Sequence, residues 1–181
     1  SSLKQGFGKM KIKQLEWEKG PVGVQIFDNR LFAVSEAAKQ AEDYGAYLID
    51  INMGCPVKKI AKKGGGSALI KDRKLAVELV KRVVESVEIP VTVKTRLGWD
   101  NKEENIEDFL LRLQNAGASM ITLHGRTRKQ GFSGKADWQM IGNLKDKLEI
   151  PLIANGDIKN PSDAINCLKQ TNADGVMIGR A

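Results

Sequence analysis

Short apolar runs alternate with amphipathic stretches along this chain, and this order constrains the fold more than any other feature. Each run is short and nearly continuous in apolar character, which is typical of a parallel strand covered on both faces. Strict alternation of strand and helix predicts right-handed βαβ units around one parallel sheet. The predicted strands are residues 22–27, 47–51, 91–95, 120–123, 152–154 and 175–178.

Five helices are predicted between these strands, because apolar residues recur there at helical spacing. Asp72 and Asn160 stand where N-caps are expected, and Pro161 suits the first turn of the last helix. Gly117 is expected to end the third helix. The apolar positions expected to face inward are Leu31, Val34, Ala38 and Ala41; Leu75, Leu79, Val83 and Val87; Ile106, Phe109, Leu110 and Leu113; Trp138, Ile141, Leu144 and Leu148; and Ala164, Ile165 and Leu168.

Polar residues recur at the predicted carboxyl ends of the strands, which favours a (β/α)8 barrel of the TIM-barrel type. No Gly-x-Gly-x-x-Gly segment opens the first helix, which weakens the case for a dinucleotide-binding sheet. A closed barrel needs eight strands and typically about 250 residues. With six predicted strands, we expect residues 1–181 to form one partial barrel that lacks the opening strands and the last helix. The strand-end polar residues are Gln25, Asn52, Lys94, His124, Asn155 and Arg180.

The chain carries a net charge of +7, from 29 basic and 22 acidic residues. This balance favours a phosphate-rich partner such as nucleic acid, with solvated surface charge that aids solubility as the alternative. Basic residues cluster at 9–13, 58–63 and 126–129, and the last two clusters follow strand-end motifs. No apolar run approaches the length of a membrane span, and the first residues lack the apolar segment of a signal peptide. We therefore expect a cytoplasmic protein without a membrane partner.

Cysteine and histidine are scarce in this chain. Cys55 and Cys167 are the two cysteines and lie far apart, which argues against a disulfide framework and fits a reducing compartment. His124 is the only histidine, which excludes a multi-histidine metal site. Cys167 lies in a helical stripe and is expected to pack in the core. Cys55 lies between Gly54 and Pro56 at a strand end, where an α/β enzyme places its chemistry; a buried thiol that only packs is the alternative.

Five short motifs follow the strands in order: Asn-Met-Gly-Cys-Pro (52–56), Val-Lys-Thr-Arg-Leu-Gly-Trp (93–99), His-Gly-Arg-Thr (124–127), Asn-Gly-Asp-Ile (155–158) and Ile-Gly-Arg (178–180). Together they resemble the tRNA-dihydrouridine synthases, most closely the bacterial B-type branch, from Val22 to the last residue. The resemblance implies a flavin-binding barrel, a carboxyl-terminal helical domain that binds tRNA, and reduction of a tRNA uridine to dihydrouridine. Because the opening strand and the helical domain are absent from this chain, we expect weak FMN retention and little turnover from it alone.

The resemblance also implies FMN as the cofactor and NADPH or NADH as the reductant. Hydride would come from N5 of reduced FMN, and Cys55 would donate a proton on the opposite face of the base. A thiol suits this role, because it releases a proton near neutral pH far more easily than a serine hydroxyl does.

Three strand-end residues are expected to contact the flavin. By resemblance, Lys94 meets the pyrimidine edge of the ring and stabilises negative charge on it; a snorkelling surface lysine and a Schiff-base lysine are the alternatives. Gln25 resembles the glutamine that hydrogen-bonds the isoalloxazine. His124 is expected to contact the flavin, with a satisfied core histidine as the alternative.

Three other polar residues are candidates for substrate binding. Asn52 is expected to hydrogen-bond a flipped uracil. Arg96 and Arg126 are expected to contact either the uracil or the flavin phosphate.

The loops after the last two predicted strands are the expected phosphate site, because barrels commonly bind phosphate there through backbone N–H groups. Asn155, Gly156 and Asp157 form the first loop, for which an ordinary turn is the alternative. Gly179 and Arg180 form the second, where the arginine would add a bidentate charge.

Two other functions stay open at this point. One is a related flavin barrel that acts on free pyrimidines, of the dihydropyrimidine or dihydroorotate dehydrogenase type. The other is a non-catalytic barrel that only binds RNA. The basic charge and the motif at 52–56 favour tRNA over free pyrimidines, and the presence of Cys55, Lys94 and His124 counts against a pure binding module.

Overall fold

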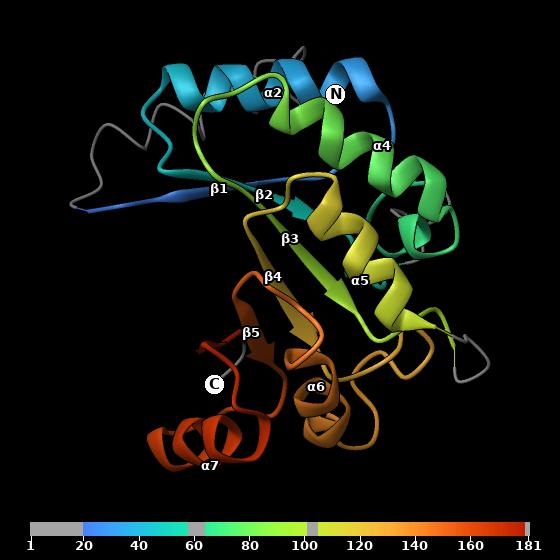
Figure 1. Ribbon diagram of the computed structural model, residues 1–181, viewed down its shortest axis with the longest axis vertical. Helices are drawn as coiled ribbons and strands as arrows, with labels where there is room; N and C mark the ends of the chain where they lie inside the picture. The colour runs from blue at the N-terminus through green and yellow to red at the C-terminus, as the bar shows by residue number, and fades with distance from the viewer. Residues whose placement is uncertain (1–19, 58–63, 101–104, 180–181) are drawn as a thin grey trace.

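The computed structural model describes residues 20–57, 64–100 and 105–179. It contains one parallel sheet of six strands, in which the spatial order of the strands follows the chain (Figure 1). All six predicted strands are confirmed, with no end shifted by more than one residue. The strands are β1 (Gly23–Ile26), β2 (Leu48–Asn52), β3 (Val91–Arg96), β4 (Met120–His124), β5 (Leu152–Asn155) and β6 (Gly175–Met177).

Each strand is joined to the next by a helix that crosses the outer side of the sheet. In Figure 1 these helices follow the sheet from α2 at the top through α5 to α7 at the bottom. Neighbouring helices pack on one another, α2 on α4, α4 on α5 and α6 on α7. The helices are α2 (Leu31–Asp43), the 3-10 helix η2 (Gly66–Ile70), α4 (Arg73–Val84), α5 (Ile106–Asn115), α6 (Trp138–Lys145) and α7 (Pro161–Thr171).

Side-chain caps fix where four of the helices begin. Asp72 accepts a hydrogen bond from the Leu75 N–H at 3.1 Å, and Asn160 accepts one from the Asp163 N–H at 2.9 Å, so both predicted N-caps are confirmed. Asn105 and Asp137 cap α5 and α6 in the same way, although the sequence patterns had not singled them out. Each cap satisfies a backbone donor that the first helical turn leaves without a partner.

The core fills the space between the helices and the outer face of the sheet. The fully buried side chains include Phe109, Leu110 and Leu113 of α5 and Ile121 and Leu123 of β4. Burial of such side chains from water is the main stabilising contribution in a fold of this kind.

The inward orientation predicted for Ile165 is wrong, because this side chain is 53% exposed. The buried positions of α7 are Cys167 and Thr171, which lie four residues apart on one helical face. Two residues correspond to about 200° of rotation on an α-helix, so a helix that buries Cys167 turns Ile165 toward solvent. The predicted packing role of Cys167 is confirmed, since its side chain is fully buried.

The sheet is the incomplete barrel that the sequence predicts. Within the described residues β1 pairs only with β2, and β6 pairs only with β5, so both outer strands have an unpaired edge. The carboxyl ends of all six parallel strands therefore lie at one end of a curved, open sheet. This is the end at which barrels of this type carry their active sites.

Leu113 on α5 is buried and Ile165 on α7 is exposed, and this difference gives a first prediction. We expect Leu113→Ala to lower the free energy of unfolding by about 2–5 kcal/mol, because it empties a fully buried site. The matched control Ile165→Ala should change it by less than about 0.5 kcal/mol, because that side chain is exposed. Urea denaturation measures both values, and equal losses would contradict the described orientation of α7.

Candidate functional site

The parallel register aligns polar side chains in rows across the inner face of the sheet. Asn52 pairs with Lys94, and Arg96 pairs with His124, which in turn pairs with Asn155. Partners in a parallel register point to the same side of the sheet, because side chains alternate along each strand. Residues from four strands, β2 to β5, are thereby directed toward one region at the carboxyl ends.

This region contains a cavity of about 370 Å³. Its volume lies toward the lower end of the range of about 300–1,000 Å³ that is typical of small-molecule sites. Arg180 lies outside the described residues, and every other site residue predicted from the sequence lines the cavity. These are Gln25, Asn52, Cys55, Lys94, Arg96, His124, Arg126, Asn155, Gly156, Asp157 and Gly179.

Lys94 is a cationic group of this cavity that keeps hydrogen-bond donors for a ligand. Its Nζ donates a hydrogen bond to Asn155 Oδ1 at 3.0 Å, and the Asn155 amide donates to the Met177 carbonyl at 2.7 Å. Among the described residues this is the one hydrogen bond that the ammonium donates, so two N–H groups remain for a ligand. Burial and the nearby Arg96 lower the pKa of Lys94, while Asp50 opposes that shift. An anionic ligand would stabilise the charged lysine.

His124 is neutral near physiological pH. Burial, followed by the positive charges of Arg96, Lys94 and Arg126, lowers its pKa to about 3. Arg126 Nη1 lies 3.3 Å from His124 Nε2. A guanidinium can only donate, so Nε2 must accept and the ring proton must lie on Nδ1. His124 can therefore offer a ligand one N–H donor, and it is unsuited to act as an acid.

Cys55 is held at the cavity by a turn that Asn52 closes. Asn52 Oδ1 accepts hydrogen bonds from the Gly54 N–H at 3.1 Å and from the Cys55 N–H at 2.9 Å. The thiol is free and half-exposed. Because its Oδ1 is engaged in this turn, Asn52 positions Cys55 in the described structure, and its predicted uracil contact stays a prediction.

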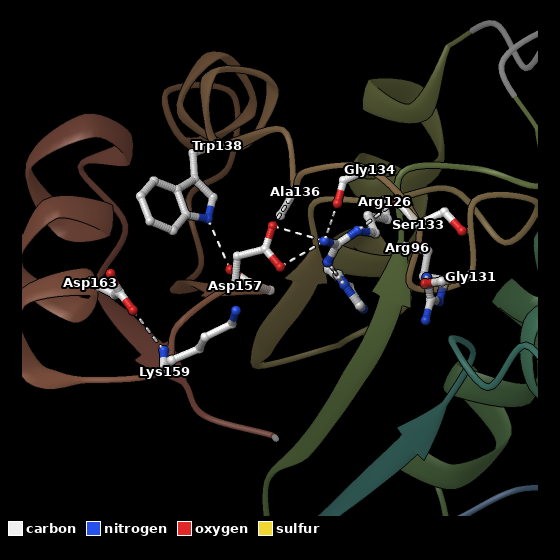
Figure 2. Close-up of polar contacts among 12 residues, drawn as sticks. Arg96, Arg126, Gly131, Ser133, Gly134, Ala136, Trp138, Asp157, Lys159 and Asp163 are labelled. Atoms are coloured by element: carbon white, nitrogen blue, oxygen red, sulfur yellow. Dashed lines mark hydrogen bonds and ion pairs between the residues drawn. The ribbon is translucent and has the colours of Figure 1, made fainter. Parts of the chain in front are cut away.

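Arg96 is almost completely buried beneath the cavity, with 2% of its surface exposed. Its Nε donates to the Gly54 carbonyl at 2.7 Å, and its Nη1 donates to the Thr127 carbonyl at 3.2 Å. The same Nη1 donates to the Gly131 carbonyl at 2.9 Å (Figure 2). The guanidinium also lies 5.6 Å from the ring centroid of Phe132. Arg96 thus ties the turn that carries Cys55 to the loop after β4, which is a positioning role that the sequence did not reveal.

Arg126 and Asp157 form the second buried connection of the site (Figure 2). Arg126 Nη2 donates to both carboxylate oxygens of Asp157, at 2.6 and 2.8 Å, and to the Gly134 carbonyl at 2.7 Å. Asp157 also accepts the Ala136 N–H at 2.6 Å. Burial raises the pKa of Asp157, but the hydrogen bonds from Ala136 and Arg126 outweigh it, and the pKa lies below its usual value.

The backbone conformation of the Asn155-Gly156-Asp157 turn restricts which residues can occupy it. Gly156 has φ of +115°, and a Cβ there would come within 2.9 Å of the His124 ring and 2.8 Å of Ala136. Its carbonyl accepts the Trp138 indole N–H at 3.0 Å. Asp157 itself has φ of 58°, a left-handed conformation that aspartate tolerates. The turn is therefore held tightly against His124, whichever ligand it meets.

Four residues of this region lie outside the predicted motifs, and one of them is Met177 of β6, which lines the cavity. Phe132 and Lys159 line the cavity from the loops after β4 and β5. Asp50 lies below Asn52 on the inner face of β2 and hydrogen-bonds Gln25 and Thr92. Alternation along β2 could have identified Asp50, since Asn52 two residues later had already been assigned to the same face. No comparable pattern marks the two loop residues.

The family model for dihydrouridine synthase (Dus) matches residues 5–181. The chain belongs to the dihydrouridine synthase family. It is 54% identical over 169 residues to a Synechocystis protein named "Probable tRNA-dihydrouridine synthase 1", which covers 93% of this chain and 48% of that protein. It is 44% identical over 164 residues to tRNA-dihydrouridine synthase B of Xanthomonas axonopodis pathovar citri, covering 91% of this chain and 49% of the relative. The chain thus spans about half the length of these curated relatives.

Solved structures of other proteins share the fold. A chimera of (S)-mandelate dehydrogenase matches with a TM-score of 0.65 at 14% identity, covering 93% of this chain and 55% of that one. A 2,3-dimethylmalate lyase matches with a TM-score of 0.60 at 17% identity, covering 86% of this chain and 52% of that one. At such low identity these likenesses concern the fold alone, and they agree with a barrel-type sheet in the dihydrouridine synthase family.

Residues 20–57, 64–100 and 105–179 contain no helix that is long and apolar enough to cross a membrane. The same part of the chain contains no group of three or more histidine, cysteine, aspartate or glutamate side chains that could hold a metal ion.

The carbonyl contacts of Arg96 predict a strong dependence on the guanidinium shape. We expect Arg96→Lys to lower the free energy of unfolding by about 2–3 kcal/mol, because an ammonium cannot reach three separate carbonyls. Arg112→Lys is the matched control, since the Arg112 side chain is 61% exposed in its pair with Asp108. Its effect should stay below about 0.5 kcal/mol. Equal effects in denaturant titrations would contradict the positioning role.

The depressed pKa of Asp157 predicts how its contribution depends on pH. A folded-state pKa below the usual 3.8 means that the stabilisation is complete above that value and disappears as the pH falls toward the folded-state pKa. We expect Asp157→Asn to lower the melting temperature at pH 7, and the gap to wild type to narrow below about pH 4. Asp146→Asn, at an exposed aspartate, is the control. A gap that does not change with pH would refute this account of the ion pair.

Proposed function

We propose that this chain is the cavity-bearing part of an enzyme that reduces a uridine of tRNA to 5,6-dihydrouridine. The observation that carries the proposal is that the family's strand-end residues converge on one cavity with a half-exposed cysteine at its edge. We further propose that residues 1–181 belong to a single barrel domain and that tRNA is also held by a helical domain outside this stretch.

The residues present fit FMN as the cofactor. The cavity offers an ammonium with unused donors at Lys94 and a neutral N–H donor at His124. When bound, FMN supplies the hydride for the reaction, and NADPH or NADH returns it to the reduced form. Lys94, His124 and Gln25 would hold the ring, and the 155–157 turn with Gly179 and Arg180 would hold the phosphate.

Cys55 is the proposed proton donor. Reduction of the C5–C6 double bond of uracil adds a hydride to one carbon and a proton to the other. In the second half of this step the S–H bond of Cys55 breaks, a C–H bond forms on the base, and the electron pair stays on sulfur as a thiolate that solvent reprotonates. His124 cannot replace the thiol, because with a pKa of about 3 its ring is neutral near pH 7, and the N–H of a neutral imidazole is far too weak an acid to protonate the base.

The surface around the cavity supports a polyanionic substrate. Lys71 Nζ and the Arg128 guanidinium lie 4.3 and 4.5 Å from the ring centroid of Trp99. These residues belong to the loops that follow β2, β3 and β4, at the same end of the sheet as the cavity. We assign this group to contacts with tRNA phosphates, which accords with the net charge of +7. The reacting base must leave its stack to enter the cavity, which loop RNA allows at low cost.

The cysteine gives the direct test of this function. We expect Cys55→Ala in the full-length protein to reduce dihydrouridine formation by about 10²–10⁴-fold, because a positioned general acid is lost. The bound flavin spectrum should not change. Cys167→Ala is the matched control, because Cys167 is buried in the core, and it should retain product formation.

Mass spectrometry of tRNA nucleosides measures the product, and free uracil serves as a second substrate. Unchanged product from Cys55→Ala would remove the thiol from the mechanism. Activity of the wild type on free uracil without activity on tRNA would contradict the proposed substrate.

A further inference from the structure

Asp50 is a charged side chain on the inner face of the sheet that the proposed mechanism does not use. It lies in register with Gln25 on β1 and with Thr92 on β3. Its Oδ2 accepts the Gln25 amide N–H at 2.6 Å, and its Oδ1 accepts the Thr92 hydroxyl at 2.8 Å. Burial raises the pKa of Asp50, and the three neighbours Gln25, Thr92 and Lys94 each oppose this shift.

A continuous series of hydrogen bonds connects this carboxylate to the turn that carries Cys55. Gln25 gives its N–H to Asp50, so its Oε1 is turned the other way and accepts the Asn52 Nδ2–H at 2.7 Å. Asn52 in turn points its Oδ1 at the backbone N–H groups of Gly54 and Cys55. Three side chains and one turn are thereby connected by hydrogen bonds that all run in the same donor-to-acceptor direction.

The donor-to-acceptor direction of this hydrogen-bond series is determined by the groups at its two ends. A carboxylate can only accept hydrogen bonds, and a backbone N–H can only donate them. The oxygen and nitrogen of each amide between them must therefore be oriented as found, because reversing either amide would place two donors or two acceptors face to face. Asp50 supplies the acceptor end, and without it Gln25 could turn and release Asn52.

We infer that Asp50 is a positioning residue, which orients Gln25 and Asn52 so that the turn presents the Cys55 thiol to the cavity. The inference rests on the proposed function only for the chemical role of that thiol. Within the described part of the chain, Asp50 is not among the residues that line the cavity, and it is connected to the Cys55 turn only through the Gln25 and Asn52 amides. Gln25 is exposed to solvent, where water competes for these bonds, so the expected effect is moderate.

The test is amide hydrogen exchange in the full-length protein, followed by NMR at the individual residues. Asp50→Asn keeps the shape of the side chain but removes the obligatory acceptor. Exchange of the Gly54 and Cys55 amides should become about five- to tenfold faster, as expected for hydrogen bonds worth about 1 kcal/mol. The Met53 amide, which donates to the Lys94 carbonyl at 2.7 Å, should not change. Asp108→Asn on α5 is the control for the loss of one exposed negative charge.

Moving the carboxylate from position 50 on β2 to position 25 on β1 should restore the hydrogen bonds of the Cys55 turn. In the double variant Gln25→Glu/Asp50→Asn, the new carboxylate at position 25 accepts from both neighbouring amides, so the direction toward Asn52 is the same as in the wild type. Exchange at Gly54 and Cys55 should return to within about twofold of the wild-type rate. Exchange that is unchanged in Asp50→Asn, or not restored in the double variant, would overturn the inference.

Turnover separates this inference from the proposed function. Asp50→Asn should lower kcat for dihydrouridine formation and leave the KM for tRNA unchanged, since the tRNA-binding surface is not altered. A lowered kcat with accelerated exchange supports the positioning role, and an unchanged kcat overturns it. A wild-type protein that forms no dihydrouridine would overturn the proposed function alone, because the exchange measurement still decides whether Asp50 orders the turn.

Discussion

The parallel register of the six strands is the constraint on which the site depends. Because partners in neighbouring strands point to the same side, the pairs Asn52–Lys94, Arg96–His124 and His124–Asn155 are set side by side without any help from loops. A slip of one residue in any strand would turn its polar side chains into the apolar layer beneath the helices. Burial of the outer face therefore fixes the strand register, and the register fixes the positions of the polar side chains on the inner face.

Two buried arginines convert this row of side chains into a shaped cavity. Arg96 binds the carbonyl of Gly54 on one side and the loop after β4 on the other, and Arg126 binds that same loop to Asp157 after β5. Burial, together with the charges of these arginines and of Lys94, also lowers the pKa of His124 and keeps it neutral. The same interactions thus order the loops and leave His124 as a neutral hydrogen-bond donor, which is why we propose Cys55 as the proton donor.

Local patterns in the sequence were sufficient for the strands, for the caps at Asp72 and Asn160, and for the strand-end residues that line the cavity. They failed where the answer depends on tertiary partners. Ile165 and Cys167 are both apolar, and only the packing of α7 against its neighbours decides which of them is buried. Arg96 and Arg126 could be placed at the site from sequence, but their binding to loop carbonyls depends on loop conformations that no sequence period encodes.

We propose that the strand-end side chains form one flavin site, and the affinity of the protein for FMN is the quantity that decides this. Titration calorimetry of the full-length protein should detect FMN binding, and Lys94→Met should weaken it by about tenfold or more, equivalent to at least about 1.4 kcal/mol. Lys169→Met, at an exposed lysine of α7, should bind as the wild type does. Absence of FMN binding to the wild type, or equal affinity in Lys94→Met, would contradict the account.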